Sequence, residues 1–284
     1  MKVTTIIAAA VVALISVASG VTAQGSTSTS GSFSGSGPNV GETPTVYNET
    51  VTSVDVPIGE KTYNTGLRTI EDGPNRCGGA LISPIHVLTS SSCLTRDIRW
   101  AAVGAHFYNG TQGGERIKVV AMITHPKYND YSNDLMVLEL EKPSTFKPVA
   151  LPAADDSDIK TGEWGTVFGW RWLRGNDTMP NRRARELQSA EVKFMSNQEC
   201  SKMMLIDDTM VCVSGLANED PCQGMVGSPV VVNPSNGNLP AEDVLVGVVS
   251  WGLDCNVVNV PSVLARISNA RSWIDSIIGG TCSS

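Results

Sequence analysis

The sequence predicts an all-β protein that ends in one α-helix, and three observations support this. The 284 residues include 27 glycines and 15 prolines and are only 6% aromatic, which is typical of short strands joined by many turns. From about Val54 onward, short apolar runs alternate with turn residues. Helical spacing of apolar residues stands out only near the C-terminus. The length suits one large domain or two fused cores.

Overall charge and hydrophobicity exclude two broad classes of protein. The chain has 21 Lys and Arg against 28 Asp and Glu, a net charge of −7, so we expect no nucleic-acid partner. Because 41% of the residues are hydrophobic, the chain can bury a core and is not wholly disordered.

The first 23 residues have the pattern of a signal peptide. A basic start at Lys2 is followed by an apolar run from Val3 to about Val17, and small residues lead to a cleavage pattern ending at Ala23. A membrane anchor is the alternative, but the run is shorter than the roughly 20 apolar residues that a span needs. We therefore expect a secreted protein with no membrane partner.

Residues 24–52 form a Ser/Gly/Thr-rich segment that we expect to be a flexible leader, because it has almost no large aliphatic side chains to bury. One N-glycosylation sequon lies in it, at Asn48, and two follow at Asn109 and Asn176. In a secreted protein these three positions should lie at the surface.

The remaining elements follow in order. Strands are expected at 80–82, 86–89, 117–120, 135–138, 229–232 and 244–249, between Gly-, Pro-, Asn- and Asp-containing turns. The helix is expected to begin after an N-cap at Ser268, to use Trp273, Ile274, Ile277 and Ile278 as its apolar face, and to stop at Gly279.

The chain has seven cysteines, for which disulfides are the default use in an oxidising compartment. Zinc is the alternative, but no CxxC or HxxxH spacing is present and His86, His106 and His125 are far apart in sequence. We expect no metal and no cofactor. Since seven is odd, one thiol is left over or pairs with another chain.

Several motifs, taken in order along the chain, resemble the trypsin-like serine proteases. They are Cys77–Ile82, Val87–Cys93, Asn133–Leu138, Phe168–Trp170, Asp220–Pro229 and Val249–Gly252. The resemblance covers about residues 53–284. It implies two antiparallel Greek-key β-barrels with a C-terminal helix, the first barrel reaching to about residue 155 and the second spanning about 156–284.

The same resemblance places the catalytic triad of that family at Ser92, Asp134 and Val226. Peptide hydrolysis of this type needs a hydroxyl nucleophile, an imidazole base and a carboxylate that orients the base. Only the carboxylate, Asp134, is present. We therefore predict that the chain is not an enzyme, and that Asp134 accepts hydrogen bonds from backbone N–H groups or the Ser92 hydroxyl.

The activation signals of the family are also missing. In trypsin-like enzymes a new N-terminus pairs with an aspartate beside the nucleophile, and Met225 takes the place of that aspartate. Between Lys2 and Lys61 there is no Lys or Arg at which to cut. We expect a chain that stays uncut and folds in one state.

The resemblance also places the specificity pocket. Its residues are Asp220, Ser250, Trp251, Gly252 and Ser262. It is either a residual Lys/Arg-binding pocket or a vestigial, partly filled cavity. The basic cluster Arg182-Arg183-Ala184-Arg185 falls in an exposed loop, which is either simply solvated or a partner contact.

The cysteine pairs implied by the resemblance are Cys77–Cys93, Cys200–Cys212 and Cys222–Cys255. Cys282 is then the remaining cysteine, which is either free or paired with another chain. In a loop-entropy model each of the two short bridged loops contributes about 3 kcal/mol.

Among inactive homologues, the chain resembles the glucanase inhibitor proteins of plant-pathogenic oomycetes. The stretch Val56–Arg68, followed by Cys77–Gly79 and Ser83–Thr89, carries this resemblance. It implies a protein secreted into the host apoplast that inhibits a plant endo-β-1,3-glucanase and limits release of defence-eliciting glucan fragments. Two alternatives are a regulatory homologue that binds an active protease or a receptor, and a residual hydrolase with an unconventional nucleophile.

Overall fold

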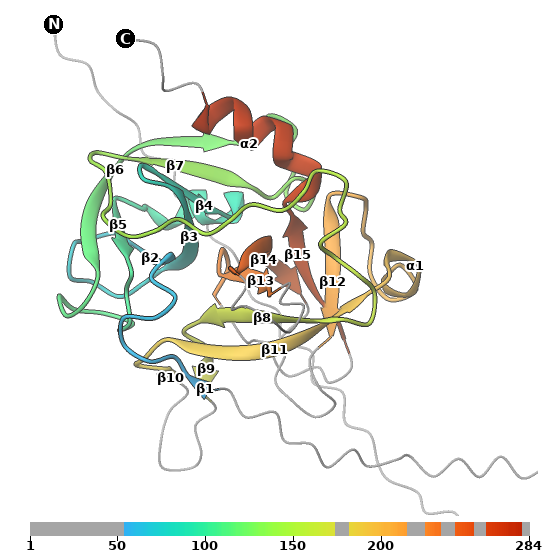
Figure 1. Ribbon diagram of the computed structural model, residues 1–284, viewed down its shortest axis with the longest axis horizontal. Helices are drawn as coiled ribbons and strands as arrows, with labels where there is room; N and C mark the ends of the chain where they lie inside the picture. Colours follow the sequence, from blue (N-terminus) through green and yellow to red (C-terminus); the bar gives the residue numbers. More distant parts are fainter. Residues whose placement is uncertain (1–53, 174–181, 215–224, 234–241, 253–259, 280–284) are drawn as a thin grey trace, which may run out of the picture. The chain divides into compact units, whose positions relative to one another are not determined.

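The structure is a computed structural model that describes residues 54–173, 182–214, 225–233, 242–252 and 260–279. These residues belong to one compact unit, Tyr47–Ser284. They form two closed antiparallel β-barrels of six strands each, and a short helix follows the second barrel in the chain (Figure 1). The all-β, two-barrel fold expected from the sequence is therefore confirmed.

The first barrel is built from a continuous stretch of chain. Its strands are β2 (Asn64–Arg68), β3 (Cys77–Ser83), β4 (His86–Thr89), β5 (Trp100–Val103), β6 (Glu115–Thr124) and β7 (Met136–Leu140). They pair in the order β2-β3-β4-β7-β6-β5, and β2 pairs with β5 to close the barrel.

The second barrel repeats this arrangement. Its strands are β8 (Trp164–Gly169), β11 (Gln188–Met195), β12 (Met210–Ser214), β13 (Pro229–Val232), β14 (Val244–Gly252) and β15 (Ser262–Arg266). They pair in the order β8-β11-β12-β15-β14-β13, closed by β13 with β8. Numbered along the chain, both barrels have the strand order 1-2-3-6-5-4. β1 (Val54–Asp55) extends the second barrel beside β11, and β9 (Trp172–Leu173) pairs with β10 (Arg182–Arg183).

All six strands expected from the sequence are present, although several are longer than expected. The 117–120 strand is part of the ten-residue β6, and the 244–249 strand extends to Gly252 as β14. The sequence analysis missed β2 and β5, which are short and lack a long aliphatic run. It also missed β8, β12 and β15, and β11, where buried and exposed residues alternate as the pleat requires.

The C-terminal helix α2 (Arg271–Ile278) is present, but its start differs from the expectation. Ser268 is not the N-cap: it begins a 3-10 turn, η2 (Ser268–Ala270), and its hydroxyl donates to the Asp156 carboxylate at 2.5 Å. Ala270 occupies the N-cap position without a side-chain hydrogen bond. Ser268 therefore makes a tertiary hydrogen bond and does not cap the helix. Two other helical segments are η1 (Ser91–Arg96) and α1 (Asn197–Cys200).

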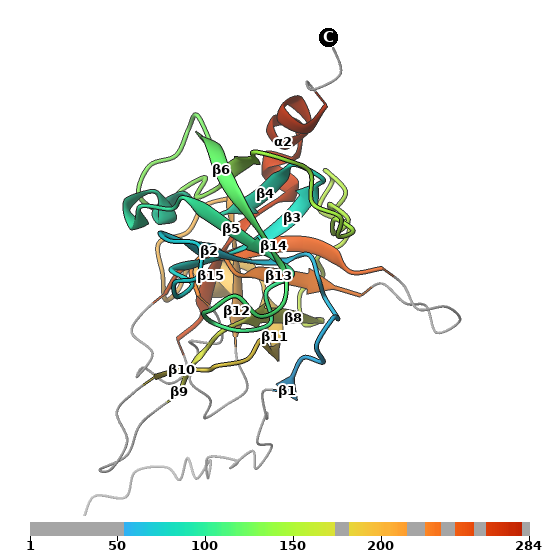
Figure 2. The same cartoon turned by 90° about the vertical axis from the view of Figure 1, so that its left-hand side faces the viewer.

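One apolar core joins the two barrels and the helix. It contains Leu88 and Leu138 of the first barrel, Val248 of the second, and Ile274 of α2, all of which are fully buried. Figures 1 and 2 both place α2 beside strands of the first barrel. A smaller cluster, which includes Phe194 and Leu264, lies within the second barrel. In the part of the chain that the structure describes, no helix has the length and hydrophobicity needed to cross a bilayer.

Candidate functional site

Asp134 lies just before β7 and is 1% exposed. Its Oδ1 accepts a hydrogen bond from the Ser92 backbone N–H at 2.9 Å. Its Oδ2 accepts from three hydroxyls, those of Ser250 at 2.5 Å, Ser90 at 2.6 Å and Ser92 at 3.1 Å. A buried carboxylate is costly unless it is paired or hydrogen-bonded, and these four bonds supply what Asp134 needs.

The three serine donors come from two places in the fold. Ser90 is the N-cap of η1, and its Oγ also accepts from the Ser92 backbone N–H at 3.1 Å. Ser250 lies on β14 of the second barrel, so its bond to Asp134 crosses between the barrels. The sequence analysis anticipated the bonds from Ser92 but missed the other two. The run Ser90-Ser91-Ser92 was the available signal for the first, whereas no local pattern pairs Ser250 with Asp134.

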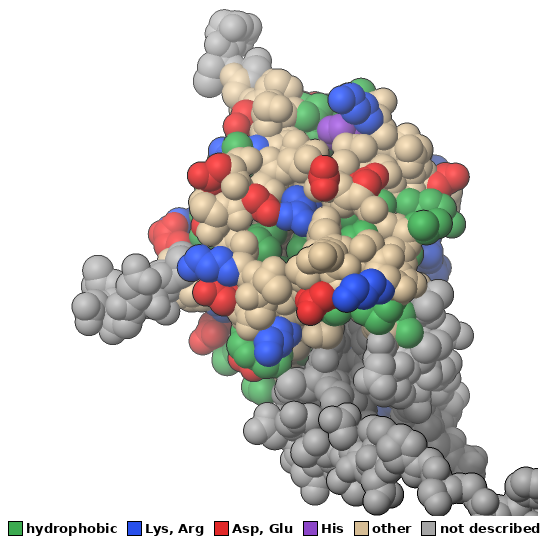
Figure 3. Space-filling model, turned by 90° about the vertical axis from the view of Figure 1, so that its right-hand side faces the viewer, with side chains coloured by type: hydrophobic (Ala, Val, Ile, Leu, Met, Phe, Trp, Pro, Cys, Tyr) green, Lys and Arg blue, Asp and Glu red, His purple; other side chains and the backbone are tan. Residues whose placement is uncertain are grey.

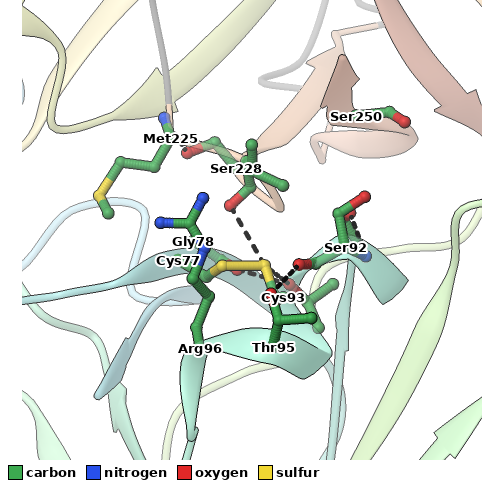
Figure 4. The surroundings of a disulfide bond; sticks show 12 residues. Cys77, Gly78, Ser92, Cys93, Thr95, Arg96, Met225, Ser228 and Ser250 are labelled. Atoms are coloured by element: carbon green, nitrogen blue, oxygen red, sulfur yellow. Dashed lines mark hydrogen bonds between the residues drawn. A yellow bond between two sulfur atoms is a disulfide. The ribbon is translucent and has the colours of Figure 1, made fainter. Parts of the chain in front are cut away.

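The turn that contains Val226 is held tightly by backbone hydrogen bonds. The Gly78 N–H of β3 donates to the Val226 carbonyl at 2.9 Å, and the Gly227 N–H donates to the Val249 carbonyl at 2.7 Å. Within the turn, the Met225 N–H donates to Ser228 Oγ at 3.1 Å. Figure 4 shows Met225 and Ser228 above Cys77 and Gly78. Ser92 lies on the other side of the Cys77–Cys93 disulfide.

Two glycines allow the barrels to approach each other here. Gly227 has φ +83°, and a Cβ on it would lie 2.2 Å from Thr89 Oγ1 and 2.4 Å from the Gly78 carbonyl oxygen. A Cβ on Gly78 would lie 2.6 Å from Ser228 Oγ. Any side chain at either position would force the turn away from the first barrel, so the backbone of this site is well defined.

None of the three histidines is bound to Asp134 or to the Val226 turn. His86 is buried in β4 with its Nδ1 2.7 Å from Ser83 Oγ, and burial lowers its pKa. The His106 Nε2 lies 3.5 Å from Glu186, and the His125 ring packs edge-on against Trp273 at 4.8 Å. Among the described residues, no group of three or more His, Cys, Asp or Glu side chains gathers to hold a metal ion.

The predicted pocket residues are only partly described. Trp251 and Gly252 end β14, and Ser262 begins β15 opposite Gly252. Ser262 Oγ lies 3.7 Å from the point where a Cβ on Gly252 would stand. Asp220 falls outside the described residues, so the pocket stays a prediction.

A groove beside Trp251 was not found from the sequence. It has a volume of about 510 Å³ and is lined by residues of both barrels: Asn129, Tyr131, Ser132, Leu205, Ile206, Asp207, Met210 and Trp251. The Tyr131 and Trp251 rings meet edge to face at 5.3 Å. Such a groove depends on loops that are distant in sequence, which is why no motif marks it.

Two of the three expected disulfides are present, Cys77–Cys93 and Cys200–Cys212. The Cys222–Cys255 pair and Cys282 lie outside the described residues. Of the three sequons, Asn109 is exposed, whereas Asn48 and Asn176 also lie outside the described residues.

Comparison with known proteins gives consistent matches. The family model described as trypsin matches residues 51–274. Glucanase inhibitor protein 3 of Phytophthora infestans is 47% identical over 231 residues, which are 79% of this chain and 86% of the relative. Glucanase inhibitor protein 2 of the same organism is 44% identical over 79% of this chain and 87% of its own length. Glucanase inhibitor protein 1 of Phytophthora sojae is 44% identical over 78% and 86%.

Proposed function

The chain belongs to the trypsin family, and from that premise we propose that it is a secreted, non-catalytic homologue that binds and inhibits a plant endo-β-1,3-glucanase. The observation that carries the proposal is the hydrogen bonding of Asp134. Its oxygens are bound by three serine hydroxyls and one N–H, at the place where a working triad needs an imidazole.

Peptide hydrolysis at this site would lack both a nucleophile and a general base. An isopropyl group, as on Val226, cannot attack a carbonyl, and the Ser92 hydroxyl is no base near neutral pH. In a serine protease, loss of the serine or the histidine alone costs about 10⁶ in rate. The well-ordered backbone around Val226 therefore supports a binding surface and not a hydrolase.

The relatives supply the class of partner, because those named above are called glucanase inhibitor proteins and the chain aligns with more than four fifths of their length. We propose a signal peptide at residues 1–23, a leader at 24–52, a trypsin-like domain at 53–284 and secretion into the host apoplast. The exposed Asn109 suits glycosylation there. Inhibition would limit the release of glucan fragments that elicit plant defence.

Inhibition would work by steric exclusion. Two fused barrels form a rigid scaffold whose loops cover the substrate cleft of the glucanase, and about 800 Å² on each partner is enough for a specific interface. Loops on such a scaffold are where recognition residues are expected.

The proposal is tested by titrating the purified protein into a plant endo-β-1,3-glucanase that hydrolyses laminarin. We expect hydrolysis to fall in proportion to the amount of protein added, and a fluorophosphonate probe for reactive serines to leave the protein unlabelled. Unchanged hydrolysis at a molar excess of the protein would refute the inhibitor function. Probe labelling together with peptide cleavage would refute the lack of catalysis.

A further inference from the structure

Five arginines lie on segments of the chain that border one another near the Val226 turn. We call Arg76, Arg96, Arg171, Arg183 and Arg185 the arginine face. The Asn75 N–H donates to the Tyr108 carbonyl at 2.8 Å, and the Tyr108 N–H donates to the Arg185 carbonyl at 2.8 Å. The segments of Arg76 and Arg185 therefore border the same residue.

The other three arginines are tied to this place by their contacts. Arg183 donates to the Trp170 carbonyl at 2.9 Å. Its pKa is lowered mainly by burial, Tyr108 opposes this shift, and the positive charge of Arg96 adds to it. The Arg171 carbonyl accepts from the Ala184 N–H at 2.8 Å. Figure 4 draws Arg96 among the residues around the Cys77–Cys93 disulfide, which adjoins the Val226 turn.

The carboxylates next to these arginines in sequence have other cationic neighbours. Asp97 pairs with Arg99 at 2.9 Å, and Glu186 lies 3.5 Å from His106. Within the described residues, Arg76, Arg96 and Arg185 are exposed and form no ion pair with a carboxylate. The Arg171 Nε is buried there without a hydrogen-bond partner.

This clustering contrasts with the rest of the chain. The net charge is −7, and Figure 3 shows one face of the molecule, on which acidic and basic side chains are interspersed. Like charges held together raise the free energy of the folded protein, so the repulsion within the cluster opposes folding. It does create a local positive potential that attracts carboxylates, which arginine binds in bidentate geometry.

We propose that the arginine face is the docking site for an acidic segment of the protein partner. This rests on the proposed function, since the partner is then the glucanase and the acidic segment belongs to its surface. Because the face adjoins the Val226 turn, docking would place the partner over the former catalytic position.

The test compares four proteins by their affinity for a plant endo-β-1,3-glucanase between 50 and 400 mM NaCl. They are the wild type, the charge-reversed Arg96→Glu/Arg185→Glu variant, the conservative Arg96→Lys/Arg185→Lys variant, and a control, Lys160→Glu/Lys202→Glu. The control makes the same change in net charge at two exposed lysines outside the arginine face. Thermal unfolding midpoints are measured for all four to establish that each is folded.

We expect the charge-reversed variant to bind about tenfold more weakly or worse, mainly through slower association, and its salt dependence to flatten. The lysine variant should fall between it and the wild type, and the control should bind like the wild type. Equal binding by the charge-reversed variant and the wild type, or equal loss in the control, would overturn the docking site while leaving the inhibitor function standing.

If the wild type binds no glucanase, the proposed function fails and the docking site is tested alone with a fluorescent hexaglutamate peptide. Binding that the charge-reversed variant loses and the control keeps would support the site. No binding, or a preference for polygalacturonate over the peptide at equal charge, would overturn it.

Discussion

Asp134 is predicted to stand where the trypsin family has its catalytic carboxylate, and its contacts are those of a structural residue. Its four hydrogen bonds join η1, the end of the β6–β7 connection and β14, so a single carboxylate organises three segments of chain. In a working protease, loss of the aspartate appears chiefly in the rate of the chemical step. Here its loss should appear in the free energy of unfolding.

Replacing Asp134 with alanine tests this role. The change leaves the buried hydroxyls of Ser90 and Ser250 without their acceptor, and we expect the free energy of unfolding to fall by about 3 kcal/mol. Urea unfolding followed by tryptophan fluorescence measures the difference. Asp134→Asn, which keeps one acceptor oxygen, should lose less. A stability equal to that of the wild type in both variants would contradict the structural role.

Gly227 provides a second test at the scale of one residue. We expect Gly227→Ala to lower the free energy of unfolding by about 3 kcal/mol, because the new methyl group meets Thr89 and the Gly78 carbonyl in addition to the strain of a positive φ. The matched control is Gly59→Ala, where φ is +88° but nothing lies within 4 Å of the added Cβ. The control should lose only about 1 kcal/mol. Equal losses in chemical denaturation would mean that the Val226 turn is free to move.

At the scale of elements, local sequence patterns predicted individual strands and the helix but not the contacts between distant residues. The run His86–Thr89 predicted the strand β4. In the structure all four residues are buried between β3 and β7. The apolar spacing of Trp273 and Ile274 predicted α2 in the same way. Ser268 was misjudged because its tertiary partner, Asp156, is 112 residues away, and sequence patterns do not reveal such distant partners.

In the candidate site, too, residues within motifs were predicted from the sequence and contacts between the barrels were not. Motifs predicted the triad positions Asp134, Ser92 and Val226, because each of these residues lies within a short signature. The bond from Ser250 to Asp134 and the groove beside Trp251 arise only where the two barrels meet, and the bond from Ser90 was not predicted either. Contacts between residues of separate elements depend on how the two barrels pack, and local sequence spacing carries no information about that packing.

β4 should also make stability depend on pH through His86. Burial lowers the pKa of His86 below its ordinary 6.5, with Glu139 on β7 opposing the shift. Between the folded and unfolded pKa values the unfolded chain binds more protons, so the free energy of unfolding falls as pH drops below about 6.5 and levels off below the folded pKa.

Replacing His86 with asparagine should remove that part of the pH dependence. The measurement is urea unfolding at pH 7.5 and pH 5 for the wild type and the variant. We expect the wild type to lose more stability between the two pH values than the variant does. An identical loss in both proteins would show that His86 has the same pKa in the folded and the unfolded chain.

At the scale of the molecule, the two barrels are joined by polar bonds as well as by the shared core. Asp243 of the second half accepts from Tyr63 at 2.6 Å and Lys61 at 2.7 Å, both of which precede β2. Ser132 donates to Asp207 on another side of the junction. With the Ser250–Asp134 bond, these contacts should make the barrels unfold together.

The buried face of α2 allows this to be tested. We expect Ile274→Ala to lower the free energy of unfolding by about 3 kcal/mol, because Ile274 is fully buried in the core that both barrels share. Far-ultraviolet circular dichroism and tryptophan fluorescence should report one coincident transition, at a lower urea concentration than in the wild type.

The matched control for this experiment is Ile277→Ala, on the same helix at a half-buried position. It should cost clearly less than Ile274→Ala. Two separate transitions in the Ile274 variant would mean that each barrel is stable without the other.

The packing of α2 also sets an order of events during synthesis. The first barrel is complete in sequence by Leu140, yet the core that it shares contains Ile274, which leaves the ribosome more than a hundred residues later. A growing chain therefore carries an uncovered apolar surface from the completion of the first barrel until Ile274 has been added. Chaperones should bind this nascent chain until its last turn of helix has emerged.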